Sequence, residues 1–161
     1  MNTPGYPSRK PKPRRPDLYE VRVTRNMGQG VFAKHNIKRG ELVFSERPLL
    51  VAPNWIATAN TNKFTLAQSR QIMMYEHEKV LGPAVQRMSE TDKALYTALY
   101  NSHTTDGTGP LLGIMRTNAF SASELSDDDE DGVLHYSAVC NHGSRLNHRF
   151  FFFFFTKLTK D

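Results

Sequence analysis

Alternating apolar and polar residues predict strands in the first third of the chain. Tyr19, Val21 and Val23 alternate with polar residues, which is the period of a half-buried strand. Residues 31–33 predict a second short strand, and the apolar residues within 41–46, continued at 49–51, predict a third. Glycine-containing turns at 26–30 and 36–40 separate these strands, so we expect a small twisted β-sheet.

The pattern becomes helical after residue 62. Thr65 and Gln68 have the spacing of a capping box, and they predict the start of a helix that ends at Gly82 and Pro83. Three apolar residues recur every seven positions and predict the buried stripe of this helix. They are Leu66, Met73 and Val80. A second helix is predicted from Ser89, and we interpret 62–101 as a helical insert into a β domain.

Strand character returns toward the end of the chain. A loop rich in Gly, Thr and Ser covers 102–110, and residues 111–120 and 133–139 predict two more strands. The acidic run at 127–131 is typical of a solvated hairpin tip, with binding of basic peptides as the alternative. The expected fold class is therefore mainly β with a helical insert, an α+β fold.

The positive charge of the chain is concentrated in its first residues. The protein has 161 residues, which suggests one domain, and a formal net charge of +5. Residues 1–16 contain five prolines, five basic residues and no acidic residue, which leaves the remainder balanced in charge. We expect 1–17 to be a disordered tail, and its basic part, 9–15, either to be solvated or to contact nucleic acid or another acidic partner.

Cysteine content and hydropathy exclude several classes of protein. The single cysteine, Cys140, excludes an internal disulfide and a cysteine-rich zinc site. Cys140, His142 and His148 lie within nine residues, but their spacing fits no common zinc pattern, so we expect no metal site and a small buried cysteine at a strand end. With no secretory h-region and no run of about 20 apolar residues, we expect an intracellular protein, nuclear or cytoplasmic, without a membrane partner.

Two short motifs are candidates for ligand contacts. Gly28-Gln29-Gly30 lacks the third glycine and the following helix of a dinucleotide-binding fingerprint. It fits either a hairpin that needs two glycines or a main chain against which a ligand lies. Asn118 is suited to capping a turn or to donating to a ligand carbonyl.

Three segments, in this order, resemble a SET domain, the fold of protein-lysine methyltransferases. Residues 26–33 resemble the family's opening K-G-x-G-hydrophobic-x-A, with Met27 where a basic residue is common. Residues 37–49 resemble its I-x-x-G-x…E-x-P continuation. Residues 136–148 resemble the approach to its S-R-hydrophobic-N-H-S-C-x-P-N motif. The resemblance covers 19–148, is closest to the SET-and-MYND-like branch and similar fungal proteins, and implies a partial SET-domain (β-clip) fold over 18–149.

The resemblance implies S-adenosyl-L-methionine as cofactor and a protein lysine as substrate. In the family, the glycine segment holds the cofactor through main-chain contacts, and an N-H pair holds its adenine and amino-acid ends. The implied cofactor-binding residues here are Met27, Gly28, Gln29, Gly30, Asn118, Asn147 and His148. Asn141-His142 is a rival N-H pair, but Ser144-Arg145-Leu146 precedes Asn147-His148 as the motif requires.

The sequence departs from the family after His148. Arg149 and six phenylalanines, 150–155, replace the expected S-C-x-P-N, and Tyr136 is the last tyrosine. We therefore expect a C-terminally truncated fragment with an aberrant tail at 150–161 and no catalytic tyrosine. We also expect weak or no cofactor binding and no methyl transfer. The alternative is a non-catalytic interaction protein, or one that contacts nucleic acid through its basic tail.

Overall fold

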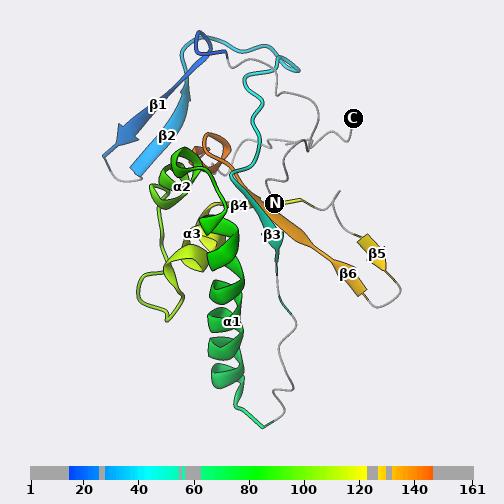
Figure 1. Cartoon of the computed structure of the whole chain (residues 1–161). Helices are drawn as coiled ribbons and strands as arrows, with labels where there is room; N and C mark the ends of the chain where they lie inside the picture. Colours follow the sequence, from blue (N-terminus) through cyan, green and yellow to red (C-terminus); the bar gives the residue numbers. More distant parts are fainter. Residues whose placement is uncertain are drawn as a thin grey trace.

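Three helices lie beside short antiparallel sheets in this chain (Figure 1). The computed structural model describes residues 15–25, 28–54, 56, 63–122, 127–129 and 132–146. The predicted α+β character is confirmed in these residues. The basic tail before Arg15 and the phenylalanine run lie outside them.

The first two strands form a hairpin that pairs with no other strand in the described part of the chain. β1 (Tyr19–Thr24) and β2 (Gly28–Ala33) are antiparallel, with Tyr19 paired to Ala33 and Thr24 paired to Gly28. The predicted first strand is confirmed, and its apolar face is covered at one end only, because Tyr19 is buried while Val23 is 76% exposed. The two glycines belong to β2 itself rather than to the turn before it.

The prediction of a strand at 41–46 is wrong. This stretch is irregular, and the next strand, β3 (Leu50–Pro53), begins only after Pro48. Proline has no main-chain N–H to give to a strand ladder, so pairing is delayed beyond it. Phe44 packs against Tyr19 instead, with ring centroids 5.2 Å apart.

The first helix begins where it was predicted and ends later. At the N-terminus of α1 (Leu66–Gln86), Thr65 forms both reciprocal bonds of the predicted capping box. Pro83 lies inside the helix instead of ending it. Leu81 and Val85 are buried on either side of it, and their packing favours continued helix over the local preference of proline.

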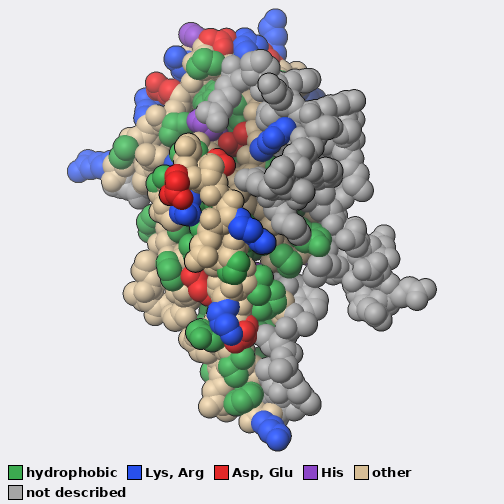
Figure 2. Space-filling view, viewed as in Figure 1, with side chains coloured by type: hydrophobic (Ala, Val, Ile, Leu, Met, Phe, Trp, Pro, Cys, Tyr) green, Lys and Arg blue, Asp and Glu red, His purple; other side chains and the backbone are tan. Residues whose placement is uncertain are grey.

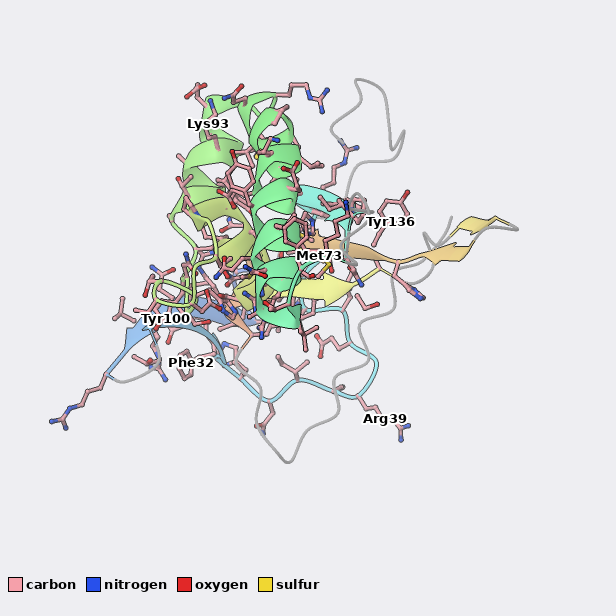
Figure 3. All side chains as sticks on the ribbon, turned by 90° about the horizontal axis from the view of Figure 1, so that it is seen from below. Phe32, Arg39, Met73, Lys93, Tyr100 and Tyr136 are labelled. Carbon is pink, nitrogen blue, oxygen red and sulfur yellow. The ribbon has the colours of Figure 1, made fainter. Side chains whose placement is uncertain are left out.

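The predicted buried stripe of α1 is also wrong. Leu66, Met73 and Val80 are 88%, 43% and 50% exposed. The residues that α1 buries are Met74, His77, Leu81 and Val85. Figure 2 shows apolar side chains on the surface where Figure 1 places α1. Met73, one of the exposed apolar residues of this helix, is labelled in Figure 3. A seven-residue spacing finds side chains on one face, but it does not tell which face meets the core.

The second helix is confirmed and a third replaces a predicted strand. α2 (Glu90–Thr97) begins at Ser89, whose side chain accepts a hydrogen bond from the Asp92 main-chain N–H. The prediction of a strand over 111–120 is wrong, because α3 (Pro110–Asn118) occupies most of it. Only β4 (Ala119–Ser121) is extended.

A distant carboxylate explains why α3 is helical. Glu78 of α1 accepts hydrogen bonds from the main-chain N–H groups of Leu111 and Leu112, at 3.0 and 2.7 Å. These groups at a helix start have no partner within the helix. Pro110 at the first position is also compatible with a helix start. The cap comes from another helix, so local sequence patterns do not reveal it.

The central sheet has three strands in the order β3-β7-β4. β7 (Tyr136–Val139) lies in the middle, and Val139 pairs with Leu50 on one side and with Ala119 on the other. The strand predicted at 133–139 is divided at His135. Its first part, β6 (Gly132–Leu134), pairs with β5 (Asp127–Asp129) in a separate hairpin made from the acidic run.

The main core lies between the three helices and this sheet, with the helices gathered on one side (Figure 1). Leu50 and Ala52 of β3 are buried, while Val51 and Pro53, which alternate with them, are only partly buried. Tyr96 of α2 is fully buried, and its hydroxyl donates to the Leu111 carbonyl at 2.8 Å. No helix among the described residues is long and apolar enough to cross a membrane.

Candidate functional site

The glycine segment, Gly28-Gln29-Gly30, lies on β2, beside the short 3-10 helix η2 (Gly143–Arg145). Gly28 has a positive φ of 65°, a conformation that side chains strongly disfavour. A Cβ built on Gly28 meets no atom within 4 Å among the described residues beyond its chain neighbours, so that part of the protein leaves the space over Gly28 open. The backbone angle, rather than crowding by the protein, is therefore what requires glycine here.

The chain leaves β7 and turns tightly into η2. The Ser144 hydroxyl accepts a hydrogen bond from the Cys140 main-chain N–H at 3.1 Å and donates to the Asn118 carbonyl at 2.9 Å. Ser144 therefore joins the start of η2 to the end of α3. A Cβ on Gly143 would lie 3.2 Å from Cys140 Cβ, so this turn has little room for a larger residue.

Glu46 holds the same turn from a third segment. Its carboxylate accepts from the His142 main-chain N–H at 2.9 and 3.0 Å and from the Gly143 main-chain N–H at 2.6 Å. Consecutive N–H groups at a helix start attract an anion, and bonds to a charged acceptor are among the stronger ones. Glu46 is the glutamate of the E-x-P motif. Its position was visible in the sequence, but its role was not predicted.

Arg145 links η2 to the glycine segment. Its Nε donates to the Gln29 side-chain oxygen at 2.6 Å, and its Nη1 donates to both the carbonyl and the side-chain oxygen of Asn141. Burial lowers the pKa of Arg145 and the charge of Glu46 opposes this, but an arginine in a protein remains charged at neutral pH. Gln29 and Arg145 are 116 residues apart in sequence, and only the tertiary structure joins them.

Three rings pack between the hairpin and this turn. Tyr19 lies 5.2 Å from Phe44 and 5.8 Å from His142, measured between ring centroids. The second pair is edge-to-face, at an interplanar angle of 84°. Tyr19 is buried, so this cluster is a small core that joins β1 to the segment before η2.

Asn118 has a structural role in this geometry. Its side-chain amide donates to the carbonyls of Tyr100, at 2.6 Å, and Ile114, at 2.8 Å. These two bonds use both amide hydrogens, so the residue closes α3 and ties it to the end of α2. Of the two alternatives for Asn118, the capping role is the one observed.

Cys140 directly follows the last residue of β7, at a strand end as predicted, but it is partly rather than fully buried. Burial, aided by the negative charge of Glu46, raises its pKa to about 12. The thiol is therefore protonated at neutral pH and unsuited to nucleophilic attack. In the part of the chain that the structure describes, no group of three or more His, Cys, Asp or Glu side chains is arranged to hold a metal ion.

Of the predicted cofactor-binding residues, Gly28, Gln29 and Gly30 are brought to η2, and Asn118 lies behind it. Met27, Asn147 and His148 lie outside the described residues. Comparisons with protein-family models, with curated proteins and with solved structures find no match.

Proposed function

We propose that this chain is related to the SET-domain protein-lysine N-methyltransferases. In this proposal β2 and the segment from Asn141 through His148 form its S-adenosyl-L-methionine clamp. One observation carries the proposal. The three segments that carry the resemblance are far apart in sequence, yet Glu46 and Gln29 both bond to the turn at η2.

The glycine segment fits a ligand held by main-chain contacts. Among the described strands, β2 pairs only with β1, so its other edge is not used by a neighbouring strand. None of the described residues beyond its chain neighbours fills the space over Gly28. An unpaired edge with a glycine at its start is suited to hold polar groups of a cofactor close to the backbone.

The proposed reaction needs orientation rather than a strong base. The cofactor would supply a methyl group on a sulfonium, which is already a good leaving group. The protein would align that methyl with a lysine amine and exclude water, and such alignment contributes a large part of a catalytic effect. Gly28, Gln29 and Gly30 would hold the cofactor through main-chain contacts, and the resemblance assigns its adenine and amino-acid ends to Asn147 and His148, which lie outside the described residues.

We further propose that this chain binds the cofactor weakly. Residues 149–161 do not continue the S-C-x-P-N motif, so they do not provide the contacts that follow His148 in the family. The experiment is an NMR titration of the isotope-labelled chain with S-adenosylhomocysteine to millimolar concentration. The expected result is a set of shifts confined to 28–31 and 141–148. No shifts, or shifts confined to the helices, would contradict the proposal.

A pair of glycine variants separates ligand contact from backbone strain. Gly28 and Gly40 both have positive φ, 65° and 83°, and a Cβ added to either glycine would meet no atom within 4 Å in the part of the chain that the structure describes, its chain neighbours aside. Asparagine tolerates this backbone conformation better than other residues do. Gly28→Asn should therefore abolish the titration response by filling ligand space, while Gly40→Asn should retain it.

A further inference from the structure

Contacts near both ends of the β1–β2 hairpin join it to other described residues. At the Tyr19 end, the ring contacts with Phe44 and His142 anchor it. At the glycine end, the Gln29 side chain reaches Arg145. A two-stranded hairpin has little stability of its own, so its orientation depends on such contacts.

We propose that Arg145 is a positioning residue that fixes the glycine segment of β2 against η2 through Gln29. This inference rests on the proposed function, because the two elements it joins are the two sides of the proposed clamp. A ligand bound across them would meet one preset geometry, and would not have to order the hairpin itself.

Two features make this pair suited to that role. Gln29 lies between Gly28 and Gly30, which have no side chains. Within Gly28-Gln29-Gly30, it is therefore the residue whose side chain can bond to η2. Arg145 bonds Gln29 through Nε and Asn141 through Nη1, so its planar guanidinium holds both sides at once. A lysine carries one flexible donor centre and does not reproduce this fork.

The test is a double-mutant cycle. For each variant, the affinity for S-adenosylhomocysteine is measured by NMR titration. Gln29→Ala and Arg145→Ala should each weaken binding about tenfold. The double variant should be no weaker than Arg145→Ala alone, because Gln29→Ala removes a bond that Arg145→Ala has already removed, together with the bonds of Arg145 to Asn141. Gln29→Glu should restore near wild-type affinity, since a carboxylate also accepts from the guanidinium. A purely structural role predicts no such rescue.

Arg22, an arginine on the β1–β2 hairpin itself, provides the control. Arg22 lies over the Phe32 ring at 3.9 Å, a contact within the hairpin, and Figure 3 labels Phe32 there. Arg22→Ala removes an arginine from β1 without touching the Arg145–Gln29 bond. It should leave the affinity within about twofold of wild type.

The outcomes separate this inference from the proposed function. If the wild-type chain binds but the single variants bind equally well, or their effects add, the positioning role is wrong and the proposed function stands. If the wild-type chain binds no ligand, the proposed function fails and the positioning role fails with it. Hydrogen exchange at the Gly30 and Val31 amides then tests whether the Arg145–Gln29 bond orders the hairpin. Unchanged exchange rates in Arg145→Ala would show that it does not.

Discussion

At the scale of single residues, partly buried acceptors and donors from distant segments shape the candidate site. Glu46 accepts from two consecutive main-chain N–H groups, and Ser144 bonds both to Cys140 and to Asn118. Each of these side chains satisfies backbone groups that would otherwise lose hydrogen bonds on folding. The turn at η2 therefore depends on a few specific side chains.

Replacing Glu46 should destabilise the protein measurably. Glu46→Gln removes the negative charge from both hydrogen bonds, and it replaces one of the two oxygens that face the His142 main-chain N–H with an amide group that cannot accept. We expect the free energy of unfolding in urea to fall by about 1–3 kcal/mol. Glu76→Gln is the control, since Glu76 pairs only with exposed Lys79 on the surface of α1, and it should have little effect. Equal losses in both variants would contradict the role of Glu46.

His77 should make stability depend on pH. Its side chain is only 6% exposed, and burial lowers its pKa below the ordinary value of 6.5, although the Pro53 main chain and the Glu78 charge oppose this. The folded state therefore favours the neutral ring, while the unfolded state takes up a proton near pH 6.5. This contribution to stability is complete above that pH, and it is lost as pH falls toward the lower folded-state pKa.

The measurement is urea unfolding between neutral and mildly acidic pH. His77→Met removes the titrating group and keeps a side chain that fits a buried site, so the loss of stability on acidification should become smaller. His103→Gln, at a partly exposed site in the loop before α3, is the comparison. An unchanged acid dependence in His77→Met would exclude the buried ring as its source.

At the scale of elements, α1 shows how tertiary contacts choose among local options. Its start follows from the Thr65 capping box, and its passage through Pro83 follows from the buried residues on either side. The apolar stripe read from sequence faces outward, and a different stripe meets the core. The helix was predictable as an element, but its orientation was not.

A pair of leucine substitutions on α1 tests this orientation. Leu81 is fully buried, so Leu81→Ala should cost about 2–5 kcal/mol of unfolding free energy. Leu66 is 88% exposed, so Leu66→Ala should change it by less than about 0.5 kcal/mol. Both variants delete the same atoms from the same helix. Comparable losses would mean that Leu66 faces a core after all.

At the scale of the whole molecule, the sheets are short and the contacts that join them are distant in sequence. Val139 of β7 pairs with Leu50 and Ala119, and η2 is held by Glu46 and Gln29. Folds that depend on such non-local pairing are sensitive to loss of strands. The proposed clamp is therefore a property of the assembled molecule.

Methyl transfer by this chain should be absent. Incubation with radiolabelled S-adenosyl-L-methionine and lysine-rich proteins should leave no label on protein, because Arg149 and the phenylalanines at 150–155 stand where the S-C-x-P-N motif of the proposed family would continue. A titration of the same sample with S-adenosylhomocysteine shows whether binding is retained. Label that appears with the wild-type chain and disappears with Gly28→Asn would refute the expectation.

The sequence by itself determined the features whose causes lie within a few residues. The capping boxes and caps at Thr65 and Ser89 located two helix starts, since the stabilising bonds join residues three apart. The positive φ of Gly28 and the strand at Tyr19 also follow from local chemistry. The ordered motifs pointed to the glycine segment and to the segment around Arg145.

Only the tertiary structure decided the features whose causes lie far along the chain. Glu78 turned a predicted strand into α3 from another helix. The core selected Leu81 rather than Val80 as a buried face of α1. Glu46, Gln29 and Arg145 met at η2 although 97 and 116 residues separate the bonded partners. Such hydrogen bonds and burial depend on the relative placement of whole elements, which local spacing does not encode.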